Sequence, residues 1–354
     1  MGIKRAMVFA AVLATLLVPT ALAAPATGAT HTEDGTHSEL LASGLQGTSG
    51  SAIGPDGALY VPEAALGEVT RIDPVSGETS TYASGLPKAV MALGGATDVA
   101  FIGQTAYVLV TLVGPDAGGD QVNGIYRVDD EDSFTVIADI GEYSRTHPPA
   151  TQFDLERGLQ FALERVPGGF LVSDGHHNRV LMVTLSGVVT EARAFGNIVP
   201  TGLESFGNIV LMAQAGPVPH TPETGKIVAF HRNHPAVVTV ASGYSLLVDV
   251  EFGRCGIYAL SQGDSPGDVV AGSPALPNSG ELLRVTPNGR FFPVAEGLNL
   301  PTSVDFVGDT AFVVNLAGEV WRISGISDSS SHGAGNLCAW ASAFGIRGLV
   351  GASE

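Results

Sequence analysis

A repeated pattern of short strand-like runs constrains the fold of this chain more than any other feature of its sequence. Residues 53–86 contain runs of alternating apolar and polar residues, separated by GPDG at 54–57 and PVSG at 74–77. Asp-Gly favours a tight hairpin turn because glycine accepts positive φ values. Alternation with a period of two predicts half-buried strands. The stretch therefore predicts a four-stranded antiparallel meander of the length of one propeller blade.

The same pattern recurs along the chain. Charged residues make up 15% of the sequence, below the roughly 25% of ordinary soluble domains, and 46 glycines supply turns. No helix-length amphipathic segment separates the runs, which argues against a parallel α/β fold. Six runs fit the second strand of a blade, centred on Tyr60, Tyr107, Leu171, Leu211, Tyr258 and Phe312. We therefore predict an all-β, six-bladed β-propeller.

The two ends of the repeat region predict how the ring closes. The last blade has only three runs, within residues 301–324, and an extra run, SELLASGL, occupies residues 38–45 before the first blade. An open ring would leave edge strands with unpaired backbone groups. We expect residues 38–45 to complete the last blade, so that the propeller spans residues 38–324.

The segments outside the propeller have distinct compositions. Residues 1–23 have the basic start, the apolar core and the Ala21-Leu22-Ala23 ending of a secretion signal, which predicts cleavage near Ala23 and an extracellular protein. Residues 24–37 are small and polar, and we expect a flexible lead-in. Residues 325–354 begin as a Gly/Ser linker and end in an apolar stretch at 337–350, for which the sequence gives no functional interpretation.

Charge and cysteine content limit the partners. The formal net charge is −18 and no basic cluster occurs, which argues against nucleic acid and anionic membrane surfaces. No run of the mature chain is long and apolar enough to predict a membrane span. We expect a monomer whose partner is a small molecule or an extracellular protein. The two cysteines, Cys255 and Cys338, either form a disulfide after export or remain free thiols.

The long insertions indicate a binding face. Residues 112–124, 214–226 and 262–280 all join a second to a third strand, and the connector at 141–156 ends on the same side. Loops gathered on one side of a rigid scaffold are typical of a binding surface. The polar residues that the strand register places at this channel mouth are Glu63, Asp98, Arg157, Asp174, Gln214, Asp249, Gln262 and Asn315.

Recognisable catalytic motifs are missing from the sequence. His176 and His177 follow Asp174, but neighbouring residues on a strand or turn point apart, so a solvated pair is the simpler interpretation. Neither a G-x-S-x-G nucleophile elbow nor a glycine-rich phosphate loop occurs. Oxygen ligands at the mouth could hold Ca²⁺ or another divalent cation, and polar but chemically inert channel lining is the alternative.

The order of several strings resembles the ScyD/ScyE family of exported six-bladed propellers. The resemblance covers about residues 38–324 and includes GPDGALYVPEA, ATDVAF, VSDGHHNRVLMVT, NIVPTGLESF, GELLRVTPNGR and NLPTSVDF. Some of these strings also occur in NHL-repeat and gluconolactonase-like propellers. The chain departs from the family pattern in its short loop at 64–67, in GTSGS at 47–51 and in its tail. The resemblance implies fold and export, and the family offers no settled active site.

Two functions remain open. We favour a non-catalytic module, without a cofactor, that binds a ligand or protein at the long-loop face and central channel. The alternative is a metal-dependent lactone hydrolase resembling gluconolactonases, with Glu63, Asp174, Asp249 and Asn315 as the metal ligands. Gluconolactonases carry a metal-binding Glu on the inner strand of the first blade. The corresponding stretch here, SGSAIG at 49–54, has no acidic residue.

Overall fold

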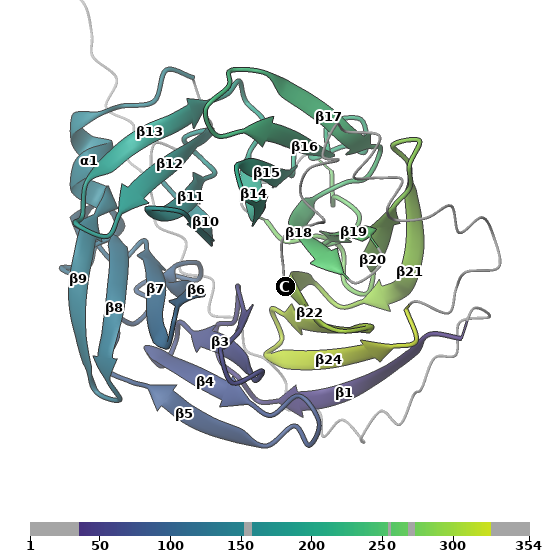
Figure 1. Cartoon of the computed structure of the whole chain (residues 1–354), viewed down its shortest axis with the longest axis horizontal. Helices are drawn as coiled ribbons and strands as arrows, with labels where there is room; N and C mark the ends of the chain where they lie inside the picture. The colour runs from purple at the N-terminus through teal and green to yellow at the C-terminus, as the bar shows by residue number, and fades with distance from the viewer. Residues whose placement is uncertain (1–34, 152–157, 254–255, 268–272, 327–354) are drawn as a thin grey trace, which may run out of the picture.

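The chain forms a ring of six antiparallel sheets, each of four strands (Figure 1). The structure is a computed structural model, and it describes residues 35–151, 158–253, 256–267 and 273–326. Each sheet begins at the ring axis with its innermost strand and ends at the rim. The architecture is a six-bladed β-propeller, as the sequence predicts.

The strands follow the predicted runs closely. Blades one to three contain β2 (Ala52–Ile53), β3 (Leu59–Glu63), β4 (Glu68–Ile72), β5 (Thr79–Ala83), β6 (Gly95–Ile102), β7 (Thr105–Thr111), β8 (Gly124–Asp130), β9 (Ser133–Asp139), β10 (Gln160–Val166), β11 (Gly169–Asp174), β12 (Arg179–Thr184) and β13 (Val189–Ala194). Blades four to six contain β14 (Pro200–Phe206), β15 (Ile209–Gln214), β16 (Lys226–His231), β17 (Val237–Ser242), β18 (Leu247–Gly253), β19 (Gly256–Ser261), β20 (Gly280–Val285), β21 (Phe291–Leu298), β22 (Pro301–Val307), β23 (Thr310–Asn315), β24 (Glu319–Ser324) and β1 (His37–Ser43).

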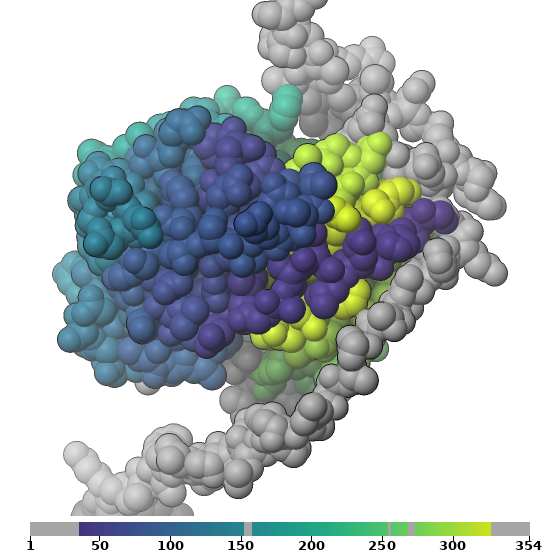
Figure 2. All heavy atoms as spheres, turned by 90° about the horizontal axis from the view of Figure 1, so that it is seen from below, coloured from purple at the N-terminus to yellow at the C-terminus, as the bar shows by residue number. Residues whose placement is uncertain are grey.

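The N-terminal strand closes the ring. In the last sheet the order is β1-β24-β23-β22, and Leu40 pairs with Trp321. Beyond this strand, the Leu45 amide donates to the Gly318 carbonyl at 3.1 Å. Figure 2 shows the purple β1 lying along the yellow C-terminal strands. The closure expected from the unmatched run at 38–45 is confirmed.

The hydrophobic core lies between neighbouring blades. Successive side chains on a strand point to opposite faces, so each second strand contributes to two interfaces. Leu59 and Val61 of blade one are fully buried against Phe312 and Val314 of blade six, next to β1. Tyr60 faces the other way, where its ring meets that of Phe101 in blade two at 4.8 Å. Because the side chains alternate between the two faces of the strand, as predicted from the sequence, each blade packs against both of its neighbours.

A short α-helix interrupts this pattern. The sequence predicts a connector at 141–156, and the structure has α1 (Ile140–Thr146) at its start, directly after blade two. Asp139 caps the helix by accepting from the Glu142 amide at 2.7 Å, and Ile140 is buried. Among the described residues, no helix has the length and apolar character needed to cross a membrane.

Candidate functional site

A cavity of about 1090 Å³ occupies the centre of the ring. Its walls come from the inner strands of the blades. Its mouth comes from the loops that join second to third strands, including Ala64, His176, Ala215, Gln262 and Leu316. Cavities of this size and position in a propeller suit a small ligand.

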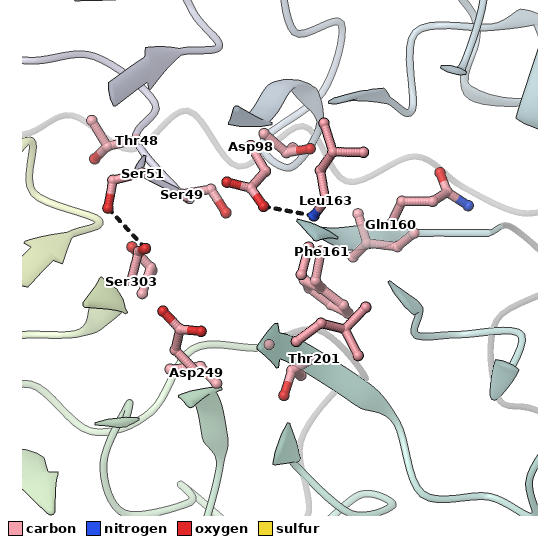
Figure 3. A pocket seen from close by; sticks show the side chains of 18 of the residues that line it. Thr48, Ser49, Ser51, Asp98, Gln160, Phe161, Leu163, Thr201, Asp249 and Ser303 are labelled. Carbon is pink, nitrogen blue, oxygen red and sulfur yellow. Dashed lines mark hydrogen bonds between the residues drawn. The ribbon is translucent and has the colours of Figure 1, made fainter. Parts of the chain in front are cut away.

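The inner strands present equivalent residues at one level of the cavity, which we call the upper tier. It consists of Gly50, Asp98, Ala162, Gly202, Asp249 and Ser303. Figure 3 shows Asp98 and Asp249 on different sides of the open centre, with Ser303 beside Ser51.

The two upper-tier aspartates join neighbouring blades. The Leu163 amide of blade three donates to Asp98 Oδ2 at 2.7 Å, and the Val304 amide of blade six donates to Asp249 Oδ2 at 2.9 Å. The other oxygen of each carboxyl accepts from the following amide of its own strand. Both carboxyls therefore have a structural role in addition to facing the cavity.

Two residues further along each inner strand lies a second level, the lower tier. Its members all pair with the central residue of the second strand, and they are Ala52, Ala100, Glu164, Glu204, Glu251 and Asp305. Because a strand repeats every two residues, both tiers face the axis. Blades three to six thus contribute four consecutive carboxyls, whereas blades one and two contribute alanines. The lower tier is therefore acidic along one arc, formed by Glu164, Glu204, Glu251 and Asp305, which we call the acidic arc.

Burial raises the carboxyl pKa values in both tiers. It raises the pKa of Asp249 to about 7, with a further contribution from the charge of Asp305. Burial likewise raises the pKa of Glu164 to about 7 and that of Asp305 to about 6. The pKa values of Asp98, Glu204 and Glu251 lie well above their usual range, first through burial and then through neighbouring carboxylates. The arc therefore retains protons near neutral pH, and a cation would favour their release.

Several of the residues predicted for the mouth lie elsewhere. Asp98, Asp249 and Gln262 line the cavity, and Gln262 also accepts from the Ala275 amide at 3.0 Å. Glu63, Gln214 and Asn315 are not among the lining residues and instead bond to nearby loops. They bond to the Gln46 amide and the Thr70 hydroxyl (Glu63), to the Thr224 carbonyl (Gln214), and to Ala317 and Glu319 (Asn315). Arg157 lies outside the described residues, as do Cys255 and Cys338.

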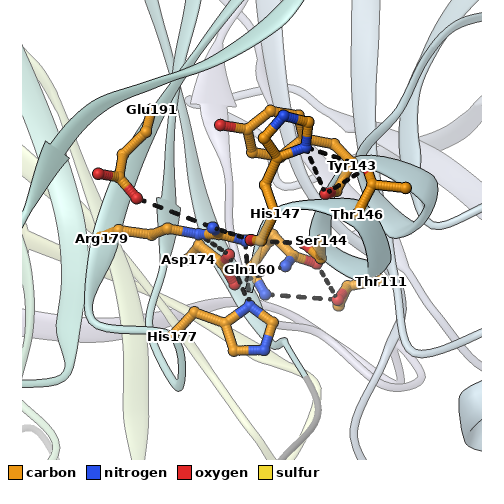
Figure 4. A network of polar contacts seen from close by, with 10 residues as sticks. All are labelled: Thr111, Tyr143, Ser144, Thr146, His147, Gln160, Asp174, His177, Arg179 and Glu191. Atoms are coloured by element: carbon orange, nitrogen blue, oxygen red, sulfur yellow. Dashed lines mark hydrogen bonds and ion pairs between the residues drawn. The ribbon is translucent and has the colours of Figure 1, made fainter. Parts of the chain in front are cut away.

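Asp174 belongs to a separate buried network, shown in Figure 4. Its Oδ2 accepts from Arg179 Nε at 2.8 Å and from His177 Nδ1 at 2.9 Å, and its Oδ1 accepts from Gln160 Nε2 at 2.8 Å. Burial alone would raise the pKa of Asp174, but His177 and Arg179 outweigh it and lower the pKa.

Arg179 extends this network to the neighbouring helix. The guanidinium donates to the His147 carbonyl at 2.7 Å and to Ser144 Oγ at 3.0 Å. The network therefore ties blade three to α1. Its groups are occupied by one another, which identifies it as a support of the fold.

The alternative metal ligands do not meet at one place. Glu63, Asp174 and Asn315 have the partners given above, and of the four residues only Asp249 lines the cavity. Within the described parts of residues 35–326, no group of three or more His, Cys, Asp and Glu side chains has an arrangement that could hold a metal ion.

The lower tier is absent from the residues predicted for the mouth, because that prediction rests on the starts of the inner strands and the ends of the second strands. A signal was present: ALER, GLES, DVEF and SVDF each carry an acid at the same distance from the second strand. Aligning the blades on Leu171, Leu211, Tyr258 and Phe312 would have revealed four acids at one register position.

Comparisons with known proteins reveal the fold. A gluconolactonase from Xanthomonas campestris is similar with a TM-score of 0.57 and 12% identity, over 84% of this chain and 93% of that chain. An aldose sugar dehydrogenase from Streptomyces coelicolor, in a PQQ-bound form, has a TM-score of 0.53 and 12% identity, over 82% and 98%. No protein-family model and no curated protein matches the sequence. At these identities the likeness concerns the propeller architecture alone.

Proposed function

We propose that this protein is an exported, ScyD/ScyE-like propeller that binds a small amine-bearing ligand in its central cavity without catalysing a reaction. The observation that carries the proposal is the acidic arc of the lower tier, of which Glu164, Glu251 and Asp305 line the cavity. The ordered strings shared with ScyD/ScyE proteins and the signal-like residues 1–23 support the family and the export.

The charges around the cavity favour a cation. Carboxyls that line it include Asp98, Glu164, Asp249, Glu251 and Asp305. Arg165 is the only lysine or arginine among the described lining residues. A bound ammonium group lowers the pKa of nearby carboxyls and donates charge-assisted hydrogen bonds to them. A neutral or anionic ligand gains nothing comparable from this wall.

Calorimetric titration with spermidine tests the ligand class. We expect saturable binding to one site at pH 7.5, and at least about tenfold weaker binding by Glu251→Gln, since a tenfold loss corresponds to about 1.4 kcal/mol. Glu131→Gln, an exposed acid outside the cavity, serves as the matched control and should bind like wild type. Absence of binding, equal affinity of both variants, or preference for D-glucose would contradict the proposal.

Lactone hydrolysis is the second candidate, favoured by one specific observation. Asp249 and Glu164 face the cavity with pKa values of about 7, a range suited to a general base at neutral pH.

A turnover assay separates the two candidates. Purified protein is incubated with δ-gluconolactone, with and without Ca²⁺, alongside Asp249→Asn. Hydrolysis above the spontaneous rate that is lost in Asp249→Asn would establish the hydrolase. Equal rates of lactone hydrolysis with wild type, with the variant and with buffer alone would contradict the hydrolase and support the non-catalytic binding function.

Export has its own test. The chain, expressed with residues 1–23 in a bacterium that secretes proteins, should reach the medium and begin at Ala24 when its N-terminus is sequenced. Retention of the full-length chain inside the cells would contradict this part of the proposal.

A further inference from the structure

Three exposed apolar side chains border the mouth of the central cavity. Met91, Leu93 and Leu316 all line the cavity, and they are 37%, 40% and 37% exposed. We call them the apolar rim. Large apolar side chains are usually buried, and a group of them at the entrance of a cavity is typical of a surface that a ligand covers. The rim therefore adds an apolar contact surface to a cavity whose lower tier is acidic.

Backbone hydrogen bonds position the rim on one side of the mouth. The Ala89 amide donates to the Ala64 carbonyl of blade one at 2.8 Å, two residues before Met91. The Leu316 amide of blade six donates to the Leu300 carbonyl at 3.1 Å. Blades six, one and two follow one another around the ring (Figure 1). The rim therefore lies on the side of the mouth that these three blades form.

The cavity wall stays apolar below the rim in blades one and two. The lower-tier residues of these blades are Ala52 and Ala100, and both line the cavity. The upper-tier residue of blade one is Gly50, and the carboxyl oxygens of Asp98 in blade two already accept backbone amides. The acidic arc lies in blades three to six. An apolar chain can therefore run down blades one and two and present a charged end to the acidic arc.

The rim and the acidic arc are separated by most of the length of an inner strand. Asn315, which directly precedes Leu316, pairs with Pro301 at the start of β22. Asp305 of the acidic arc follows on the same strand, and the step from position 301 to position 305 covers about 13 Å. A ligand that contacts both the rim and the arc must therefore carry its apolar group at a comparable distance from its charge.

We propose that the ligand of this cavity is an amphipathic amine, whose ammonium group binds at the acidic arc and whose apolar chain runs along blades one and two to the apolar rim. The proposal rests on the amine-binding function proposed above and adds the apolar half of the ligand. Transfer of an alkyl chain from water to an apolar surface is favourable in proportion to the area that is buried. A polyamine such as spermidine satisfies only the charged half of the site.

Calorimetric titration with two amines of equal charge tests this ligand class. The chain of decylamine is long enough to extend from the acidic arc to the rim, whereas that of butylamine is not. At pH 7.5, and below the concentration at which decylamine forms micelles, we expect decylamine to bind at least about fiftyfold more tightly than butylamine. Decanol, which has the chain without the charge, should bind at least about tenfold more weakly than decylamine.

Variants of the rim test where the chain binds. Met91→Ser combined with Leu93→Ser should weaken decylamine binding at least about tenfold and leave butylamine binding within about twofold of wild type. Leu185→Ser combined with Val188→Ser changes two exposed apolar residues outside the cavity. This matched control should bind both amines like wild type. Glu251→Gln should weaken the binding of both amines by a similar factor, because it alters only the charged half of the site.

The outcomes separate this proposal from the function on which it rests. Equal affinities for decylamine and butylamine would overturn the apolar contact and leave the cation site in place. If neither amine bound, the cation site itself would be contradicted, and this proposal with it. Equal affinities for decanol and decylamine would overturn the assignment of an amine.

A variant at the opposite end of the cavity completes the test. Phe252 also lines the cavity and is 37% exposed, near the hairpin that follows β18. Phe252→Ser should leave decylamine binding within about twofold of wild type. A loss of decylamine binding in Phe252→Ser, with no loss in the rim variant, would overturn the proposal, because the chain would then leave the cavity at its hairpin end.

Discussion

The buried Asp174 network illustrates how single residues hold this fold. Asp174 is fully buried and Arg179 is 1% exposed, so each charge depends on the other for compensation. Asp174→Asn should lower the free energy of unfolding by roughly 3–5 kcal/mol, because it leaves the buried guanidinium with only the more distant, half-exposed Glu191 carboxylate at 3.8 Å. Urea unfolding measures the loss.

An exposed ion pair supplies the comparison. Asp129→Asn removes the carboxylate that Arg127 Nε contacts at 2.6 Å near the surface, and should cost less than about 1 kcal/mol. Similar losses in Asp174→Asn and Asp129→Asn would show that the buried network does not support the fold.

Glycines in the upper tier make room for aspartates of the next blade. A Cβ on Gly202 would lie 2.4 Å from Asp249 Oδ1 and 2.6 Å from the Asp249 Cα. Since backbone cannot yield as a flexible side chain can, Gly202→Ala should destabilise the protein by about 1–3 kcal/mol. Gly196→Ala, where no atom lies within 4 Å of the added carbon, should change the melting temperature little. Equal effects of the two substitutions would contradict this explanation.

At the scale of elements, ring closure depends on a strand from the start of the chain. β1 supplies Ala42 to the interface between blades six and one, and pairs along β24 from Ser324 to Glu319. Deleting residues 38–45 exposes the edge of β24 and opens this core. The melting temperature should fall by more than about 10 °C, since each kcal/mol shifts it by roughly 2–4 °C in a chain of this size.

The same strand offers a control for that deletion. Leu40 is 49% exposed although it belongs to β1, so Leu40→Ser should leave the melting temperature nearly unchanged. Circular dichroism follows both transitions. A deletion that melts like wild type would show that closure by β1 is dispensable.

The strands and the helix also show which parts of the structure can be predicted from the sequence. The alternation of apolar and polar residues, together with the turn residues, predicted the six blades and their closure. A propeller repeats one local pattern, and local patterns can be recognised in a sequence. The α1 helix was missed because a capping Asp139 and seven residues carry little periodicity. At the site, Asp98, Asp249 and Gln262 line the cavity, whereas Glu63, Gln214 and Asn315 bond to neighbouring segments of the chain. The strand register predicts which residues lie at the ends of strands, but which segment the side chain of such a residue contacts depends on tertiary packing.

For the molecule as a whole, the raised carboxyl pKa values predict lower stability at higher pH. Glu164, Asp249 and Asp305 have pKa values of about 7, 7 and 6 in the folded protein, against roughly 4 when unfolded. Between these values the folded state binds more protons, so its stability is highest near the unfolded pKa and falls as pH rises through the folded values. The melting temperature should therefore be higher at pH 5 than at pH 8, as measured by calorimetry at constant ionic strength.

Glu251→Gln tests the origin of this pH dependence. The pKa of Glu251 is raised first by burial and then by Glu204, Asp305, Asp249 and Glu164. Removing its charge should raise the melting temperature at pH 8 and reduce the difference between pH 5 and pH 8. If the difference between the melting temperatures at pH 5 and pH 8 did not change, the pH dependence would have to come from groups outside the acidic arc.

The acidic arc and the proposed amine ligand make one joint prediction about protons. A cation that binds where carboxyls retain protons must displace some of them. Calorimetric titration with spermidine at pH 6.5, in buffers with different ionisation enthalpies, measures this exchange directly. We predict release of about one proton per bound spermidine, reduced in Glu251→Gln. Binding without proton release, or with proton uptake, would contradict a cation site at these carboxyls.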